Sequence, residues 1–122
     1  MSSPSQPEPA PQPGETRVLD LALKRWHDKP CGEQIQADLI ARAEEGLKKY
    51  GTYLETNNGR DALMDAYQEA LDLLMCLEQE NAERNIRTNS SGYGMPIKIA
   101  LETALFIRLA LNRREERQKG PA

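Results

Sequence analysis

The stretch DALMDAYQEALDLLMCLEQENAER, residues 61–84, decides the fold of this chain. It has no glycine or proline and consists mostly of good helix formers, which predicts a helix of about six turns. Apolar side chains fill about 200° of its circumference, whereas the apolar stripe of an ordinary surface helix is nearer 100° wide. We therefore expect this helix to be packed on more than one side.

A narrow acidic strip occupies another part of the circumference of this predicted helix, within an arc of about 80°. Its members are Asp61, Asp65, Glu69 and Asp72. Carboxylates this close repel one another unless a cation joins them. Asp61 has a simpler role, because a carboxylate in the first turn complements the helix dipole. The other three are candidate ligands for a cation, and Glu69 and Asp72, three residues apart on one helix, can share or bridge a metal ion.

A second helix is predicted upstream, at 33–50, by five apolar residues on one face: Ile35, Leu39, Ala43, Leu47 and Tyr50. Glu44 and Glu45 have two explanations. They form favourable i,i+4 ion pairs with Lys48 and Lys49, or one of them, preferably Glu44, faces the acidic strip and helps to hold the cation.

The connection 52–60, TYLETNNGR, is polar and contains the turn signal Asn58-Gly59. Asn57 or Asn58 is the predicted N-cap of the central helix. Arg60, with Lys48 and Lys49, brings positive charge to this end of the acidic helix. These cations can receive a phosphate chain or merely balance the acids.

In the C-terminal part of the sequence, residues 85–95 are predicted to form a loop, which is either a lid or a plain connector. A last helix is predicted at 96–117, and it begins with Pro96. The apolar residues of this helix cover nearly its whole circumference. A small domain cannot easily bury that much surface, so we expect a homo-oligomer with a symmetric dimer as the base case. The basic residues at the C-terminal end suit the helix dipole. No aromatic residue interleaves with them, so nucleic acid is not an expected partner.

The N-terminal residues 1–14 are rich in proline, serine and glutamine and predict a disordered tail. Residues 15–29 fit a short helix or an alternating strand, and we favour the helix. The expected fold is an all-α domain at 15–118, a bundle of about four helices. The single histidine, His27, beside Asp28, is expected at the surface, because no second histidine supports a metal site or a triad.

Composition excludes several classes of protein. The net charge of −3 gives no global attraction to nucleic acid or to anionic membranes. There is no apolar run of about 18 residues and no signal peptide, so a cytoplasmic protein is expected. The two cysteines do not form a disulfide framework, and Cys76 is expected to be a buried thiol. The P-loop and Rossmann glycine motifs are absent.

One segment, residues 42–77, resembles small phage and bacterial members of the all-α nucleotide pyrophosphohydrolases, the MazG-like and dUTPase-like superfamily. The family pattern has paired acids on one helix and an ExxD on the next, a couple of dozen residues later. Glu69-Ala70-Leu71-Asp72 matches the ExxD, and an apolar run follows it. The upstream ExxE is absent, and the adjacent pair Glu44-Glu45 lies at a suitable distance in its place.

The resemblance implies a Mg²⁺-dependent enzyme that converts a nucleoside triphosphate into the monophosphate and pyrophosphate. The metal would neutralise charge on the phosphate oxygens and orient the attacking water. The implied catalytic residues are Glu44, Glu45, Glu69 and Asp72, which with Asp65 are also the candidate metal ligands. Candidate nucleotide-binding residues are Lys48, Lys49 and Arg60. Because the ExxE is absent, the alternative is a noncatalytic helical nucleotide-binding or protein-interaction module.

Overall fold

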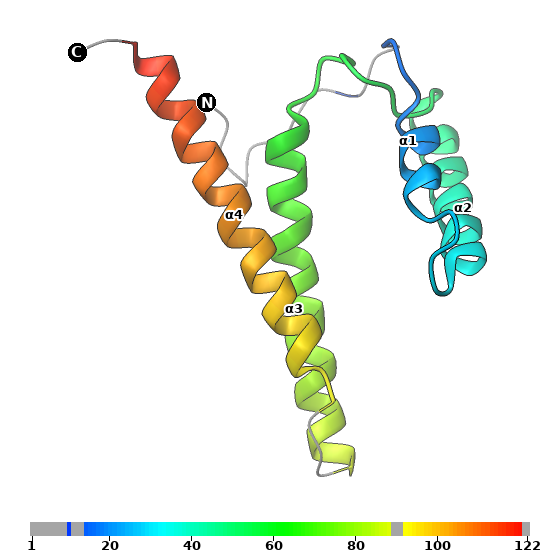
Figure 1. The fold of residues 1–122 in the computed structure, drawn as a ribbon, viewed down its shortest axis with the longest axis vertical. Coiled ribbons are helices and arrows are strands. Elements are labelled where there is room, and N and C mark those ends of the chain that lie inside the picture. The colour runs from blue at the N-terminus through cyan, green and yellow to red at the C-terminus, as the bar shows by residue number, and fades with distance from the viewer. Residues whose placement is uncertain (1–9, 11–13, 89–91, 121–122) are drawn as a thin grey trace. The chain divides into compact units, whose positions relative to one another are not determined.

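The computed structural model describes residues 10, 14–88 and 92–120. The described chain consists of four α-helices (Figure 1): α1 Val18–Arg25, α2 Gly32–Tyr50, α3 Ala62–Thr88 and α4 Gly94–Lys119. The described residues contain no β-strand, only one isolated antiparallel bridge between Arg17 and Glu55. The prediction of an all-α fold with about four helices is confirmed. Within the described ranges, no helix is both long and apolar enough to span a membrane.

The described chain falls into two compact units. The first contains α1, α2 and the segments that flank them, up to Arg60. The second is the α3–α4 hairpin, which begins at Asp61. The tail predicted at 1–14 lies outside the described residues except for positions 10 and 14.

In the first unit, a short antiparallel pairing precedes α1 and resolves the choice between helix and strand. The Thr56 amide donates to the Thr16 carbonyl (2.7 Å), and the Val18 amide donates to the Leu54 carbonyl (2.9 Å). The chain is therefore extended up to Arg17 and helical from Val18 to Arg25. The polar connection at 52–60 thus supplies the partner for this extended segment.

The helix α2 ends as its sequence predicts. Gly51 adopts a left-handed conformation with φ of 77°, and its amide donates to the Leu47 carbonyl (2.8 Å), as at many helix C-termini. On the predicted apolar face, Ile35, Leu39, Ala43 and Leu47 are half-buried, and α2 packs against α1. Tyr50, the last member of that face, is 45% exposed.

The start of α3 differs from the prediction, because neither asparagine is its N-cap. The Asp61 carboxylate accepts a hydrogen bond from the Met64 amide (3.1 Å), which is the geometry of an N-cap. Asn58 is used one turn earlier, where its side chain accepts from the Arg60 amide (3.1 Å). Asn57 has a left-handed backbone with φ of 56°. Both asparagines therefore stabilise the turn that precedes the helix.

The predicted loop at 85–95 is shorter than expected, because α3 continues through Thr88 and α4 already begins at Gly94. No glycine or proline interrupts 85–88, so nothing in that sequence stops the helix. Pro96 lies in the first turn of α4, where its missing amide hydrogen removes no helical hydrogen bond. The rest of the predicted lid or connector includes 89–91, which lie outside the described residues.

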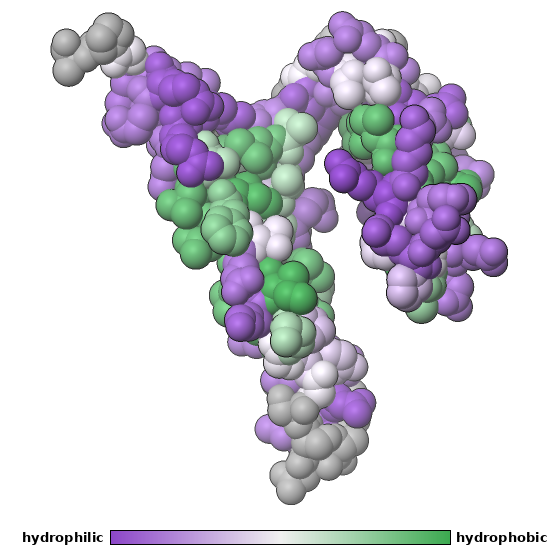
Figure 2. Space-filling model, viewed as in Figure 1, coloured by the Kyte–Doolittle hydropathy of each residue, from purple (hydrophilic) through white to green (hydrophobic). Residues whose placement is uncertain are grey.

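The hairpin core is small. Its buried apolar residues are Met64, Ala70, Ala100 and Leu111. Among the described residues of this unit, α3 packs only against α4, and none of them covers the expected second contact surface of α3. Figure 2 shows apolar side chains exposed along the hairpin, and Met75 and Phe106 are 63% and 64% exposed. Cys76, expected to be buried, is also exposed.

Candidate functional site

The exposed face of α3 carries the candidate metal ligands. An α-helix places Asp65, Glu69 and Asp72 on successive turns of one side. Glu69 and Asp72 are exposed, whereas Asp65 is half-buried and already makes an interaction. Among the described residues, neither Glu69 nor Asp72 has a hydrogen-bonding or ionic partner. Their four carboxylate oxygens therefore remain available to a ligand.

Asp61 is separated from this strip by an ion pair with α4. The Arg114 guanidinium donates to both carboxylate oxygens, Nη1 to Oδ1 at 2.9 Å and Nη2 to Oδ2 at 2.7 Å. These hydrogen bonds hold the pKa of the Asp61 carboxyl below its usual value; burial opposes the shift, and the Met64 amide adds to it. Sequence reasoning gave Asp61 a first-turn role but missed Arg114, which lies 53 positions away in the sequence.

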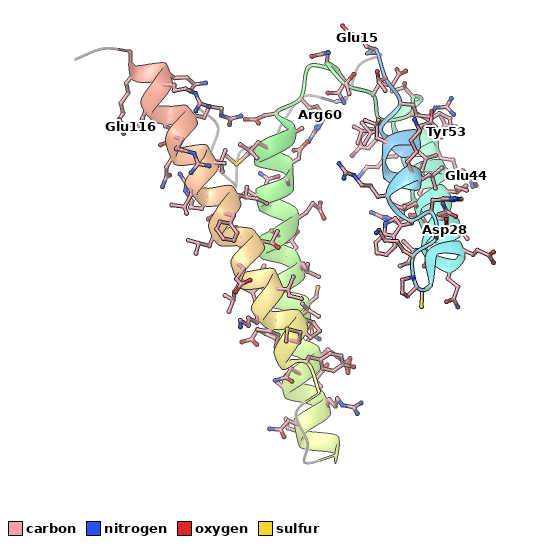
Figure 3. All side chains as sticks on the ribbon, in the orientation of Figure 1. Glu15, Asp28, Glu44, Tyr53, Arg60 and Glu116 are labelled. Atoms are coloured by element: carbon pink, nitrogen blue, oxygen red, sulfur yellow. The ribbon has the colours of Figure 1, made fainter. Side chains whose placement is uncertain are left out.

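The acidic pair on α2 is exposed, and Figure 3 labels Glu44. Glu45 pairs with Arg42 (3.0 Å), so the predicted Glu45–Lys49 pair is not formed. Among the described residues Glu44 has no ionic partner, so the predicted Glu44–Lys48 pair is also not formed. Exposed helical ion pairs are worth only about 0.3–0.5 kcal/mol, so the choice between such partners is finely balanced. Glu44 is therefore the less engaged member of the pair.

The candidate phosphate-binding cations belong to the first unit. Lys48 and Lys49 are exposed in the last turn of α2, where positive charge also suits the helix dipole. Lys49 Nζ lies 5.2 Å from the centre of the Tyr50 ring. Arg60 is half-buried in the connection that follows α2 (Figure 3), and it makes further interactions. The dipole accounts for the two lysines, whereas Arg60 has no such explanation.

The donor chemistry on α3 fits a hard divalent cation. Mg²⁺ usually binds one or two protein carboxylates and keeps several waters or phosphate oxygens as its other ligands. Glu69 and Asp72 can supply this minimum. No group of three or more His, Cys, Asp or Glu side chains that could hold a metal occurs among the described residues. Substrate phosphates or further carboxylates would have to complete the coordination.

A second polar region lies between α1 and α2, where a hollow of about 570 Å³ is lined by residues such as Trp26, His27 and Cys31. His27 Nε2 lies 3.1 Å from Asp28 Oδ2, and both side chains are at least 80% exposed. The expectation of a surface histidine therefore holds. Asp28 and Cys31 have positive φ angles, near 58° and 57°, a conformation that the sequence did not indicate.

Comparisons with known proteins found no matching family model, no matching curated protein and no matching solved structure. Function is therefore inferred from two observations. One is the sequence resemblance of 42–77, and the other is the exposed pair of carboxylates on α3.

Proposed function

We propose that the protein is a Mg²⁺-dependent nucleoside triphosphate pyrophosphohydrolase that releases a nucleoside monophosphate and pyrophosphate from an NTP or dNTP. The observation that carries the proposal is the position of Glu69 and Asp72, which are exposed, unpaired among the described residues and one turn apart on α3. They are also the ExxD of the segment that resembles this superfamily.

The bond that breaks joins the α- and β-phosphates, and one water molecule is consumed. A bound Mg²⁺ would neutralise the charge that develops on the phosphate oxygens and would orient that water. Glu69 and Asp72 would hold the ion, with Asp65 beside them and Glu44 or Glu45 as a further ligand. A carboxylate of this set would accept the proton of the water. Lys48, Lys49 and Arg60 are the proposed contacts for the triphosphate.

The decisive experiment combines metal-dependent melting with pyrophosphate release for the wild type, Glu69→Gln and Asp72→Asn. A ligand present at 100 times its dissociation constant stabilises the folded state by about 2.7 kcal/mol, so Mg²⁺ or Mn²⁺ should raise the melting temperature of the wild type. Both variants should lose that gain and their metal-dependent cleavage. In metal-free buffer they should melt at or above the wild-type temperature, because repulsion between the carboxylates is reduced.

The matched control is Glu78→Gln, which neutralises an exposed carboxylate of the same helix outside the strip. It should retain both activity and metal response. The proposal fails if neither metal stabilises the wild type and Glu69→Gln cleaves a panel of nucleoside triphosphates as fast as the wild type does.

The acidic pair on α2 is tested separately. We expect Glu44→Gln to lower turnover more than Glu45→Gln, because Glu45 is engaged by Arg42. Equal turnover in both variants and the wild type would remove α2 from the proposed site without removing α3.

The absent ExxE favours one alternative, a noncatalytic helical module that binds nucleotide or another protein. Such a module could bind a nucleoside triphosphate in isothermal titration calorimetry but would release no pyrophosphate after long incubation with Mg²⁺. A variant such as Arg60→Gln would then weaken binding, although there would be no turnover to measure.

We also propose that the protein works as a homo-oligomer in the cytoplasm. Support for assembly comes from the hairpin, in which exposed large apolar residues outnumber buried ones. Support for a reducing compartment comes from Cys31 and Cys76, both free thiols at the surface. Light scattering at about 100 μM, well above a micromolar dissociation constant, should report a mass close to or above twice 13.7 kDa.

A further inference from the structure

The side of α4 that faces away from α3 has a regular pattern. Ala100 and Leu111 are buried on the side that contacts α3. On the opposite side, alternating steps of three and four residues form a continuous stripe, which we call the outer stripe of α4. It consists of Ile99, Glu102, Phe106, Leu109, Arg113 and Glu116. Phe106 and Leu109, at its middle, are 64% and 41% exposed.

Two charges of this stripe stand out because they are unpaired. Several other charged side chains of α4 have partners in their own chain: Arg108 contacts Glu115 (3.4 Å), Arg114 contacts Asp61 (2.7 Å), and Lys119 contacts Glu116 (3.1 Å). Glu102 and Arg113 have no hydrogen-bonding or ionic partner among the described residues. They have opposite signs and lie at equal distances in sequence on either side of the pair Phe106 and Leu109.

We propose that the outer stripe is the contact surface for a second copy of this chain, in which the two α4 helices pack antiparallel about a two-fold axis. The axis lies level with residues 107 and 108. Phe106 is then level with Leu109 of the second copy, and Glu102 is level with Arg113 of the second copy. Two-fold symmetry forms each contact twice, giving an apolar centre flanked by two ion pairs.

The pattern favours a second copy over another occupant because it is self-complementary. An antiparallel, two-fold contact requires that a residue on one side of the axis suit the residue equally far on the other side. The outer stripe meets this requirement at its central apolar pair and at its unpaired charges. The end positions, Ile99 and Glu116, do not match, and Glu116 is paired with Lys119 of its own chain. A contact with a different surface would place no such condition on α4.

The surface relief of α4 agrees with this arrangement. A shallow hollow of about 400 Å³ is lined by Leu109, Asn112, Arg113, Glu116 and Arg117. In the proposed register, Phe106 of the second copy is level with the Leu109 end of this hollow. An aromatic ring is the largest exposed apolar side chain that α4 offers to fill it.

The size of the stripe sets the expected strength of the dimer. Residues 99 to 116 span about 26 Å of helix at 1.5 Å per residue. A single helix pair of this length is smaller than the usual interface of about 800 Å² per partner. We therefore expect a dissociation constant on the order of micromolar.

The test is a charge-reversal series measured by sedimentation equilibrium without nucleotide or metal. Glu102→Arg and Arg113→Glu should each raise the dissociation constant at least about tenfold, since each places like charges together at two symmetric positions. The double variant should return to within about threefold of the wild type, because the pairs re-form with reversed signs. Asp38→Arg, the same charge change on an exposed residue of α2, should leave the constant unchanged.

Several results would overturn the inference. A wild type that remains monomeric at 100 μM excludes the second copy, and a lower melting temperature of Phe106→Ala in that monomer would indicate that the chain covers its own stripe. A dimer unaffected by both single reversals uses another surface. If the dissociation constant of the double variant does not return toward the wild-type value, the proposed register of the two helices is wrong. If circular dichroism shows that a charge reversal unfolds the chain, the neutral variants Glu102→Gln and Arg113→Gln take the place of the reversals. Each is expected to raise the dissociation constant about threefold. Because no substrate is present, these outcomes are independent of the proposed activity.

Discussion

The ion pair between Asp61 and Arg114 offers the sharpest test of how the hairpin is stabilised. Asp61→Asn removes the negative charge but keeps an oxygen that can cap α3, since asparagine caps helices about as well as aspartate. The pair is bidentate at 2.7 and 2.9 Å, and the two side chains are only 26% and 24% exposed. Charge-assisted hydrogen bonds contribute about 1.5–3 kcal/mol, and partial exposure reduces this. We expect a loss of about 1–2 kcal/mol in the free energy of unfolding.

The assay is urea unfolding at fixed protein concentration, followed by circular dichroism at 222 nm and by tryptophan fluorescence. The only tryptophan, Trp26, lies in the first unit, so its signal need not follow the hairpin. Asp61→Ala should lose about 1 kcal/mol more than Asp61→Asn, because the cap is also removed. A double-mutant cycle with Arg114→Met isolates the pair. A coupling energy below about 0.3 kcal/mol would refute the reasoning, since the contact would then behave as an ordinary surface pair.

The same pair predicts a dependence on pH. The pKa of Asp61 is lowered in the folded state, so the stabilisation is fully present above the unfolded value of about 3.9. It is lost as the pH falls further, through the folded pKa. The difference in unfolding free energy between the wild type and Asp61→Asn should therefore be constant from pH 5 to 7 and shrink below about pH 4. A difference that grew on acidification would contradict the assignment.

Two further pairs of substitutions test packing. Leu111→Ala should lower the unfolding free energy by about 2–4 kcal/mol because Leu111 is fully buried, whereas Leu101→Ala, at a position 52% exposed, should lose less than half as much; similar losses would mean that the hairpin core is misplaced. Gly32→Ala should destabilise α2, because a Cβ there would collide with the Trp26 carbonyl. Gly46→Ala, with open space around it, should gain about 0.5–1 kcal/mol, and thermal melting that ranks the two in the opposite order would refute this account.

The helices could be predicted from the sequence because their signals are local. Gly51 marks the end of α2, and the uninterrupted run of helix formers marks the body of α3. The predicted N-cap of α3 was wrong because the same residue type suits two local roles. Asn57 and Asn58 suit a cap or a turn equally well in sequence, and only the folded chain shows that Asp61 takes the cap.

The site was less predictable because contacts between distant residues determine it. Periodicity placed Asp65, Glu69 and Asp72 on one side of α3, and the helix agrees with that placement. It could not show that Asp61 would be bound by Arg114, because that contact joins two helices. The many apolar residues of α3 suggested contacts on several sides of the helix, and Cys76 was therefore expected to be buried. In the structure α4 covers one side of α3, and Cys76 is exposed.

The two proposals occupy opposite edges of the hairpin. Glu69 and Asp72 lie on the side of α3 that faces away from α4, whereas the outer stripe with Phe106 and Arg113 lies on the side of α4 that faces away from α3. A second copy bound through α4 would therefore leave the oxygens of the strip uncovered. Loss of metal binding should not change the dimer constant, and loss of the dimer should not remove the metal ligands. The hairpin could then use its excess apolar surface for assembly and keep its carboxylates for chemistry.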